Sequence, residues 1–442
     1  MIRSYLRWIF TPALCLFLTH LECPAENLST LTNEHISLSV DLDAGGAITR
    51  LSSPKLGNVV NNHDLGRQIQ MAYYSGPVPF ITNGQSPKDH WKHLGWNPIQ
   101  AGDDFGNGSK TTKHSNDGHQ IHTRCIPLQW PLKNIPGECV FESWIHLEGH
   151  QVHARYRISN HRSDRTAYPP RAQELPAIYA NANLHRVVSY TGDRPFTGQP
   201  ITVIERAKNK PGWAEWNGTE FWSAALDEND RGLGVIRDSR SWFIGGFDGR
   251  PGPNDTRAAS TAYIAGHEIE TIDHDATHEF TVTLVLGTLT QIRESAAHLA
   301  NKTRLPAWQF LGNRQGWHSR NTTDQNPSGS GVWTLKMESP DPQLVSPQTF
   351  WRAEDAPVLE IEATLATASN RCQIFLRPHG RTDFLNPIEL LTKPDGTRQT
   401  YRVHLANHPD YHGGMLQIRI DPVPSGTPSD ELRLHAVRLV PK

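Results

Sequence analysis

The feature that most constrains the fold is an alternation of apolar and polar residues in short segments that turn residues separate. Helical spacing of apolar residues is persuasive only over 289–302. The 34 Gly and 32 Pro among 442 residues supply turns at short intervals. The period of two, typical of half-buried strands, is clearest over 35–42, 140–147, 150–159, 279–286 and 358–364. The sequence therefore predicts an all-β protein made of sandwiches or barrels.

The length predicts more than one domain, because a single hydrophobic core rarely grows past about 300 residues. The helix-like segment ends near residue 303, and a segment of new character opens at Trp308. We therefore expect one domain over 30–303 and a second over 306–442.

The first 25 residues have the pattern of a signal peptide. Arg3 and Arg7 precede the apolar stretch 8–21, and a small residue follows shortly after it. We expect 1–25 to be removed from a secreted or periplasmic protein. A lipid anchor at Cys23 and an uncleaved anchor are the alternatives. No later apolar run approaches the ~20 residues of a membrane span.

The charge balance excludes one class of partner. The chain has 43 basic and 45 acidic residues, so its formal net charge is −2. A nucleic-acid-binding protein needs a basic excess to neutralise phosphates. We therefore expect no nucleic-acid partner.

Three cysteines remain if cleavage follows Ala25. They are Cys125, Cys139 and Cys372, and an odd number leaves at least one thiol free. Cys125 and Cys139 flank a loop-like segment rich in proline. A disulfide Cys125–Cys139 across its base and a pair of buried thiols are the two interpretations.

The ends of the first region carry a resemblance to a known family. Residues 36–51 form a strand, glycine turn and strand pattern, and 280–289 form a strand that precedes the helix-like segment. The region resembles the galactose-mutarotase-like β-supersandwich, a scaffold of aldose epimerases, several polysaccharide lyases and some glycoside hydrolase domains. The resemblance implies a large β-supersandwich that acts on carbohydrate. The catalytic residues of the epimerases have no convincing match here.

The second region resembles a different architecture. Its matching segments are Gly316-Trp317, 341–347, 359–363, 374–376, 416–422 and 432–439. They are similar to the jelly-roll modules of secreted carbohydrate-active enzymes. The resemblance implies a smaller jelly-roll β-sandwich, like a carbohydrate-binding module, that binds sugar or braces the first domain.

The densest polar cluster of the first domain lies over 63–74. Arg67 offers a bidentate guanidinium for a uronate carboxylate or a sulfate, and Gln68 and Tyr74 lie beside it along the strand. We assign these three residues to substrate binding. The alternative is a structural Arg67–Asp64 pair.

A loop over 90–107 combines aromatic, histidine and acidic residues with glycine. Loops of this composition on a rigid β scaffold often carry binding groups. We assign His93, Trp96 and Asn97 to substrate binding and Asp103 to acid or base catalysis. A solvated turn is the alternative for the aspartate.

The same loop also contains residue types that bind metal ions. His90 and His93 have a loose ligand spacing without an evident third ligand. Asp103 and Asp104 offer oxygen ligands for calcium. We expect no metal and no cofactor, with calcium as the alternative.

Two glutamates have surroundings that suit catalysis. Glu174 follows Arg171 and Gln173 and enters an apolar run, where desolvation raises a carboxyl pKa. Glu220 lies between Trp216 and Trp222. We assign the glutamates to catalysis and their four neighbours to substrate binding. Buried structural ion pairs and core tryptophans are the alternatives.

These residues favour an enzyme that cleaves glycosidic bonds of a polysaccharide or oligosaccharide. Glu174 and Glu220 would form the carboxylate pair of a glycoside hydrolase. A polysaccharide lyase, with Arg67 beside a tyrosine or histidine base, is nearly as well supported. A non-catalytic carbohydrate-binding protein is the third interpretation. No Gly-x-Ser-x-Gly motif supports a serine hydrolase.

Overall fold

The computed structural model describes residues 27–74, 84–94, 98–206, 212–300, 305–325 and 331–441. Within these ranges the regular secondary structure is almost entirely strand, and every strand pair is antiparallel, as in Leu28–Thr32 with Ser37–Asp41. The prediction of an all-β sandwich protein is confirmed. The predicted signal peptide lies outside the described residues. No helix in the described ranges has the length and apolar character to cross a membrane.

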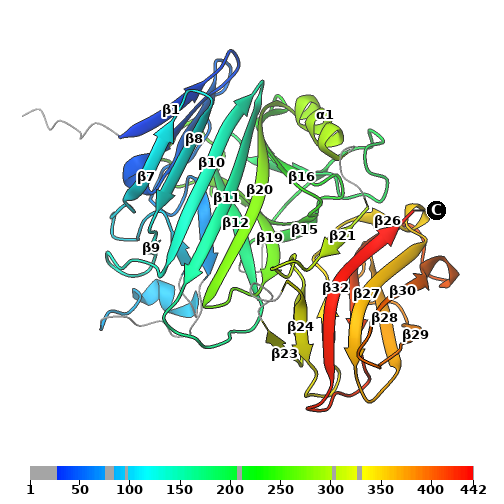
Figure 1. Cartoon of the computed structure of the whole chain (residues 1–442). Coiled ribbons are helices and arrows are strands. Elements are labelled where there is room, and N and C mark those ends of the chain that lie inside the picture. Colours follow the sequence, from blue (N-terminus) through cyan, green and yellow to red (C-terminus); the bar gives the residue numbers. More distant parts are fainter. Residues whose placement is uncertain are drawn as a thin grey trace, which may run out of the picture.

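The N-terminal sandwich is a pair of sheets that face each other (Figure 1). The β12 sheet has the order β1 (Leu28–Thr32), β2 (Ser37–Asp41), β3 (Ala47–Ser53), β5 (Ile69–Tyr74), β12 (Arg171–Asn181), β19 (Thr261–Glu270), β18 (Trp242–Asp248) and β15 (Ala214–Asn217). Three short strands extend it, namely β4 (Gly57–Asn58), β6 (Pro98–Gln100) and β9 (Leu128–Gln129). The β20 sheet has the order β14 (Thr202–Val203), β13 (Arg186–Ser189), β16 (Trp222–Leu226), β17 (Arg231–Arg237), β20 (Asp275–Thr288), β11 (Gln151–His161), β10 (Cys139–Glu148), β8 (Gln120–Cys125) and β7 (Thr111–Asn116).

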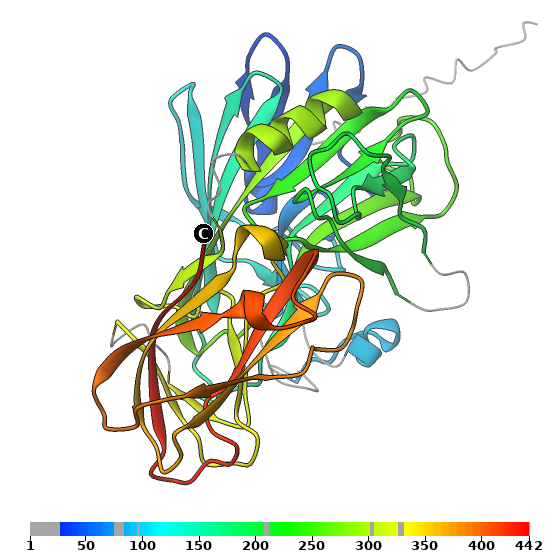
Figure 2. The same ribbon diagram turned by 90° about the vertical axis from the view of Figure 1, so that its right-hand side faces the viewer.

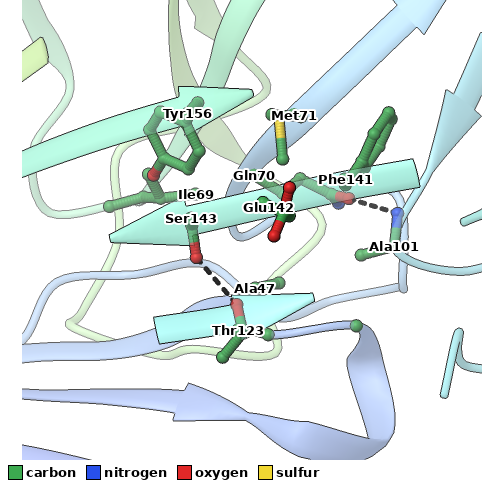
Figure 3. Close-up of a pocket in the computed structure, with 12 residues that line it drawn as sticks. Ala47, Ile69, Gln70, Met71, Ala101, Thr123, Phe141, Glu142, Ser143 and Tyr156 are labelled. Carbon is green, nitrogen blue, oxygen red and sulfur yellow. Dashed lines mark hydrogen bonds between the residues drawn. The ribbon is translucent and has the colours of Figure 1, made fainter. Parts of the chain in front are cut away.

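The core of this sandwich follows from the alternation seen in the sequence. Leu38, Val40, Ile145, Val152 and Leu284 point between the sheets and are fully buried. Burying each such side chain contributes about 1.5–3 kcal/mol. One small cavity of about 20 Å³ remains between the sheets, roughly the space of one water molecule (Figure 3).

The predicted helix is α1 (Leu289–Ala300), which follows β20 directly. It lies across the β20 sheet, and Ile292 and Ala296 are its buried residues (Figure 2). Gly234 on β17 makes this packing close, because a Cβ there would lie 2.6 Å from the Ile292 Cγ2 atom. Short 3-10 turns occur at Leu42–Ala44, Asp89–Leu94, Ala353–Asp355 and Leu405–Asn407.

The C-terminal sandwich also has two antiparallel sheets, whose strands pair only among themselves in the described part of the chain. One sheet has the order β23 (Thr323–Gln325), β24 (Trp333–Lys336), β32 (Glu431–Val440), β27 (Val358–Ala366) and β30 (Arg398–His404), with β21 (Ala307–Gln309) beside β32. The other has the order β22 (His318–Arg320), β25 (Gln343–Val345), β31 (Gly414–Asp421), β28 (Arg371–Pro378) and β29 (Ile388–Leu391), with β26 (Trp351–Arg352) beside β31. Its own core includes Trp317 and Trp333.

The two sandwiches meet at a polar junction (Figure 2). Arg314 Nη1 binds Asp273 of the N-terminal sandwich at 2.7 Å. The same guanidinium binds Asp324 with Nε at 2.8 Å and Nη2 at 3.0 Å. Arg240 Nη2 also donates to the Gln315 carbonyl at 3.0 Å. One buried arginine therefore links carboxylates of both sandwiches.

Of the two interpretations of Cys125 and Cys139, the pair of buried thiols is confirmed, and there is no disulfide between them. Both cysteines are free and buried, and so is Cys372. Cys125 ends β8 and Cys139 begins β10, and the two thiols belong to the hydrophobic core. Burial raises the pKa of the Cys125 and Cys372 thiols to about 12, so both stay protonated and unreactive near neutral pH.

We expect these three thiols to resist alkylation in the native protein and to react fully in denaturant without a reductant. Iodoacetamide labelling followed by peptide mass spectrometry measures both states. Recovery of a Cys125–Cys139 disulfide peptide from unreduced protein would contradict the free thiols.

We expect Arg314→Met to destabilise the protein by about 3–5 kcal/mol, because it leaves the Asp273 and Asp324 carboxylates without their partner. Differential scanning calorimetry measures the loss as a lower Tm. Arg433→Met is the matched control, because Arg433 pairs with Glu431 at the surface, where a salt bridge contributes about 0–1 kcal/mol. Equal Tm values for the two variants would contradict the role of Arg314.

Candidate functional site

The candidate site lies on the outer face of the β12 sheet, the face turned away from the sandwich core. Ile178, Ile264 and Phe243 point into the core from β12, β19 and β18. Because side chains alternate along a strand, their neighbours point outward. We call this surface the Glu174 face and define it by Glu174, Tyr179, Trp213, Glu215, Trp242, Tyr263 and His267.

Small residues form the middle of this face. Ala177 on β12 pairs with Ala265 on β19, which pairs with Ile244 on β18. Larger side chains stand on both sides of this row. Glu174 pairs with His267 on one side, and Tyr179 pairs with Tyr263 on the other. The face therefore has a low apolar floor between aromatic and charged groups.

Glu174 is the carboxyl group at the centre of the polar contacts. Its Oε2 atom accepts a hydrogen bond from the Tyr263 hydroxyl. Burial raises the pKa of Glu174, the nearby charge of Glu215 raises it further, and the Tyr263 hydrogen bond offsets part of the shift. A carboxyl with a raised pKa keeps its proton closer to neutral pH, which suits a general acid.

Three tyrosines surround this carboxyl. Tyr179 and Tyr263 stack with ring centroids 4.5 Å apart. Burial raises the pKa of Tyr74, Tyr179 and Tyr263 above the ordinary value, and the charge of Glu174 adds to the shift. Their hydroxyls therefore stay protonated and act as hydrogen-bond donors near neutral pH.

Glu215 is a second, more exposed carboxylate on the same face. Its side chain is 52% exposed, and its Oε2 atom accepts a hydrogen bond from Trp242 Nε1 at 3.2 Å. The Trp242 ring also contacts His267 with centroids 4.0 Å apart. Burial, with the charge of Arg237, lowers the pKa of His267 to about 4, so the imidazole is neutral above that pH.

An aromatic ring and an arginine close one side of the face. The Trp213 ring lies 4.9 Å from the Tyr263 ring, and the Arg206 guanidinium lies 4.4 Å above Trp213. Gly246 makes this arrangement possible, because a Cβ there would lie 2.7 Å from the Arg206 side chain. Arg206 also forms an ion pair with Asp248.

The structure places some predicted binding residues beside this face in bracing positions. Arg67 Nη1 donates to the Ala259 carbonyl at 2.7 Å, and Arg67 Nε lies 3.5 Å from Asp64. Gln68 is buried with a φ of +67° and bonds the Asp64 carbonyl. These contacts hold the start of β5, as the alternative interpretation of Arg67 expected.

Gln173 and Arg171 flank Glu174 on β12. The Gln173 amide accepts from the Tyr74 backbone N–H at 2.9 Å and donates to the Tyr74 carbonyl at 3.1 Å. It therefore fixes β5 against β12. Arg171 is partly buried, and its charge lowers the pKa of Tyr74 against the larger effect of burial.

The structure does not bring Glu220 to Glu174. Glu220 is 1% exposed, and Arg293 of α1 binds its Oε1 at 2.9 Å. The Trp222 indole and the Phe196 backbone N–H donate to it at 2.8 Å each. The assignment of Glu220 to the catalytic pair is therefore corrected, since its oxygens serve a buried structural network.

The two tryptophans assigned to sugar stacking belong to the hydrophobic cores. Trp222 is fully buried beneath α1, and Trp216 is 7% exposed and stacks on Phe243. Neither ring is available to a ligand. Their assignment to substrate binding is therefore corrected, and core packing, the alternative, explains both.

Asp103 also has a structural position. Its Oδ1 accepts from the backbone N–H groups of Phe105 and Asn107, and its Oδ2 accepts from the Asn107 side chain and the Asn134 N–H. The four donors fill the carboxylate, which leaves no oxygen for catalysis or calcium. The other residues assigned in this loop are not compared, because Trp96, Asn97 and the side chain of His93 lie outside the described residues.

Sequence reasoning missed several members of the Glu174 face. Tyr263, Trp242 and Glu215 are not among the site residues that the sequence predicts. Alternation along β15 was the available signal, because Glu215 points away from its buried neighbour Trp216.

Comparisons with known proteins gave distant matches of fold. No family model matches, and no curated protein matches. A 4-alpha-glucanotransferase from Thermococcus litoralis matches at 13% identity and a TM-score of 0.34, over 60% of this chain and 38% of the other. A galactose mutarotase-like protein from Lactobacillus casei matches at 11% identity and 0.37, over 59% and 99%. A putative aldose 1-epimerase from Klebsiella pneumoniae matches at 10% identity and 0.33, over 61% and 81%.

We expect Glu174→Gln to stabilise the protein more at pH 7.5 than at pH 4.5. The raised pKa of Glu174 means that the folded state resists ionisation, so stability falls as pH rises from the ordinary value of 4.5 through the folded pKa. Glutamine removes this loss and keeps an oxygen that accepts from Tyr263.

The Tm difference between Glu174→Gln and wild type, measured at both pH values, tests this prediction. Glu389→Gln, a change at a surface glutamate of β29, is the control for removal of one carboxylate. The same Tm difference for Glu174→Gln at both pH values would show that Glu174 has no raised pKa.

Proposed function

We propose that this protein is a secreted carbohydrate-active enzyme that hydrolyses glycosidic bonds, with the Glu174 face as its active site. One observation carries the proposal: Glu174, whose pKa is raised, lies on the same face as a second carboxylate, Glu215, among aromatic rings. Glycoside hydrolysis needs a protonated and an ionised carboxyl group beside the scissile bond.

Glu174 is the general acid in this proposal. Tyr263 holds Oε2, which leaves Oε1 to carry the proton toward the glycosidic oxygen. Transfer of this proton to the leaving oxygen avoids the release of an unstable alkoxide. The apolar floor of Ala177 and Ala265 supports the role, because low polarity keeps the carboxyl protonated.

Glu215 is the second carboxylate. It is far more exposed than Glu174, and the Trp242 indole holds one of its oxygens. An ionised carboxylate in this position activates a water molecule or attacks the anomeric carbon. Activation of water inverts the anomeric configuration, whereas attack by the carboxylate retains it. The anomeric configuration of the products distinguishes the two roles.

The surrounding rings and arginines suit a sugar chain with acidic substituents. Trp213 and Tyr179 offer apolar faces to the C–H faces of sugar rings. Arg206 lies above Trp213, and guanidinium groups bind carboxylates and sulfates. A uronate-containing or sulfated polysaccharide or oligosaccharide is the substrate class that this combination favours.

A polysaccharide lyase is the second candidate, because tyrosines and arginines share the same face. A lyase needs a base that removes the C5 proton. The raised pKa of Tyr74, Tyr179 and Tyr263 makes tyrosinate scarce near neutral pH, which favours hydrolysis over elimination.

In the same proposal, the C-terminal sandwich acts as the jelly-roll, carbohydrate-binding-like module.

We expect products with one added water per cleavage when the mature protein is incubated with a panel of acidic and neutral polysaccharides. Mass spectrometry of the products makes the measurement. Glu174→Gln and Glu215→Gln should each lower kcat by about 10²–10⁴-fold, because each removes one partner in proton transfer or attack. Glu389→Gln is the matched control and should keep full activity.

The other outcomes separate the remaining functions. Products with an unsaturated end that Glu174→Gln still forms would identify a lyase with a different base. Retention on a polysaccharide without any product would identify a carbohydrate-binding protein. Either result would refute hydrolysis at the Glu174 face.

A further inference from the structure

A second polar cluster lies on the opposite side of β19 from the Glu174 face. Glu268 and Glu270 point from β19 toward the β20 sheet, where His278 of β20 meets them. One ligand atom from each residue lies within 4.8 Å of the other two. The cluster therefore joins the two sheets of the N-terminal sandwich next to the junction.

Each residue of this cluster has one buried polar atom without a hydrogen-bond partner among the described residues. Glu268 is 5% exposed and Glu270 is 6% exposed. The Oε1 atoms of both glutamates and the Nε2 atom of His278 are buried and unpartnered among the residues that the structure describes. Leaving such groups unsatisfied costs about 1–3 kcal/mol each, and more for charged groups. A bound cation would remove that cost.

The spacing of these atoms fits ligands around an ion. His278 Nε2 lies 3.7 Å from Glu268 Oε1, and His278 Nδ1 lies 3.9 Å from Glu270 Oε2. Both distances exceed hydrogen-bond length. Metal–ligand bonds of about 2.0–2.4 Å place ligand atoms roughly 3–4.8 Å apart.

Two cavities of about 290 and 510 Å³ border the cluster. His278 lines both, and the larger one is also lined by residues 311–313, 315 and 316 of the C-terminal sandwich. This open space leaves room for a water molecule or another ligand beside the three donors.

The charges around the cluster divide its two carboxylates. Arg237 Nη2 lies 3.3 Å and Arg240 Nε 3.9 Å from Glu268 Oε2, so both guanidinium contacts go to Oε2 and not to Oε1. Among the described residues, Glu270 has His278 as its ion-pair contact and no guanidinium within 4.0 Å. A bound cation would therefore meet carboxylate oxygens that no guanidinium contacts.

We propose that Glu268, Glu270 and His278 bind a divalent transition-metal ion of the zinc class. Two carboxylates and one imidazole are the ligand set that such ions accept, whereas calcium prefers oxygen ligands alone. The site does not rest on hydrolysis at the Glu174 face, because Glu268 and His267 point to opposite sides of β19.

The test uses the full-length mature protein, stripped with a chelator and then dialysed with ZnCl₂. We expect about one zinc ion retained per chain by plasma mass spectrometry, and a higher Tm with zinc than without it. Glu270→Gln should lose both the retained ion and the Tm increase. Without zinc its Tm should equal or exceed that of wild type, because the variant removes a buried carboxylate whose Oε1 atom has no hydrogen-bond partner.

Glu279→Gln is the matched control, because it removes one negative charge from the same cavities without removing a ligand. It should retain zinc as wild type does. His278→Gln is a second variant that should lose zinc. Three outcomes would overturn the proposal: no zinc retained by wild type, equal zinc loss in Glu270→Gln and Glu279→Gln, or a Tm increase with CaCl₂ and none with ZnCl₂.

Discussion

The alternation of side chains along β19 determines which polar and aromatic groups lie on each side of the β12 sheet. Tyr263, Ala265 and His267 point to the outer face, and Glu268 and Glu270 reach the other side. Both sides of this strand are buried by neighbouring residues, so a shift of register by one residue would exchange two entire sets of side chains. The aromatic face and the three-donor cluster therefore depend on one register.

The junction between the sandwiches holds the connection that follows β19. Arg314 binds Asp273, in the connection between β19 and β20, and ties it to Asp324 of the C-terminal sandwich. That connection carries the chain from one sheet to the other between Glu270 and His278. The C-terminal sandwich thereby fixes the end of the strand that bears both clusters.

Local pattern was enough to predict strands and the helix, because alternation and turn residues act over a few positions. The candidate site was predicted only in part. Glu174 was found because desolvation is visible in its own apolar segment. Glu220 was misassigned because its partner Arg293 lies 73 residues away. Tyr263, 89 residues from Glu174, gave no local sign that its hydroxyl would bind that carboxyl.

The β12 strand contains an irregularity between Glu174 and Ala177, where its register against both neighbours shifts. Residues three apart in a regular strand face opposite sides, yet the irregularity places Glu174 and Ala177 on the same face. The segment should accept no change of length. During divergence, a one-residue insertion or deletion here would carry the carboxyl into the core, so natural variants should conserve the number of residues in this bend.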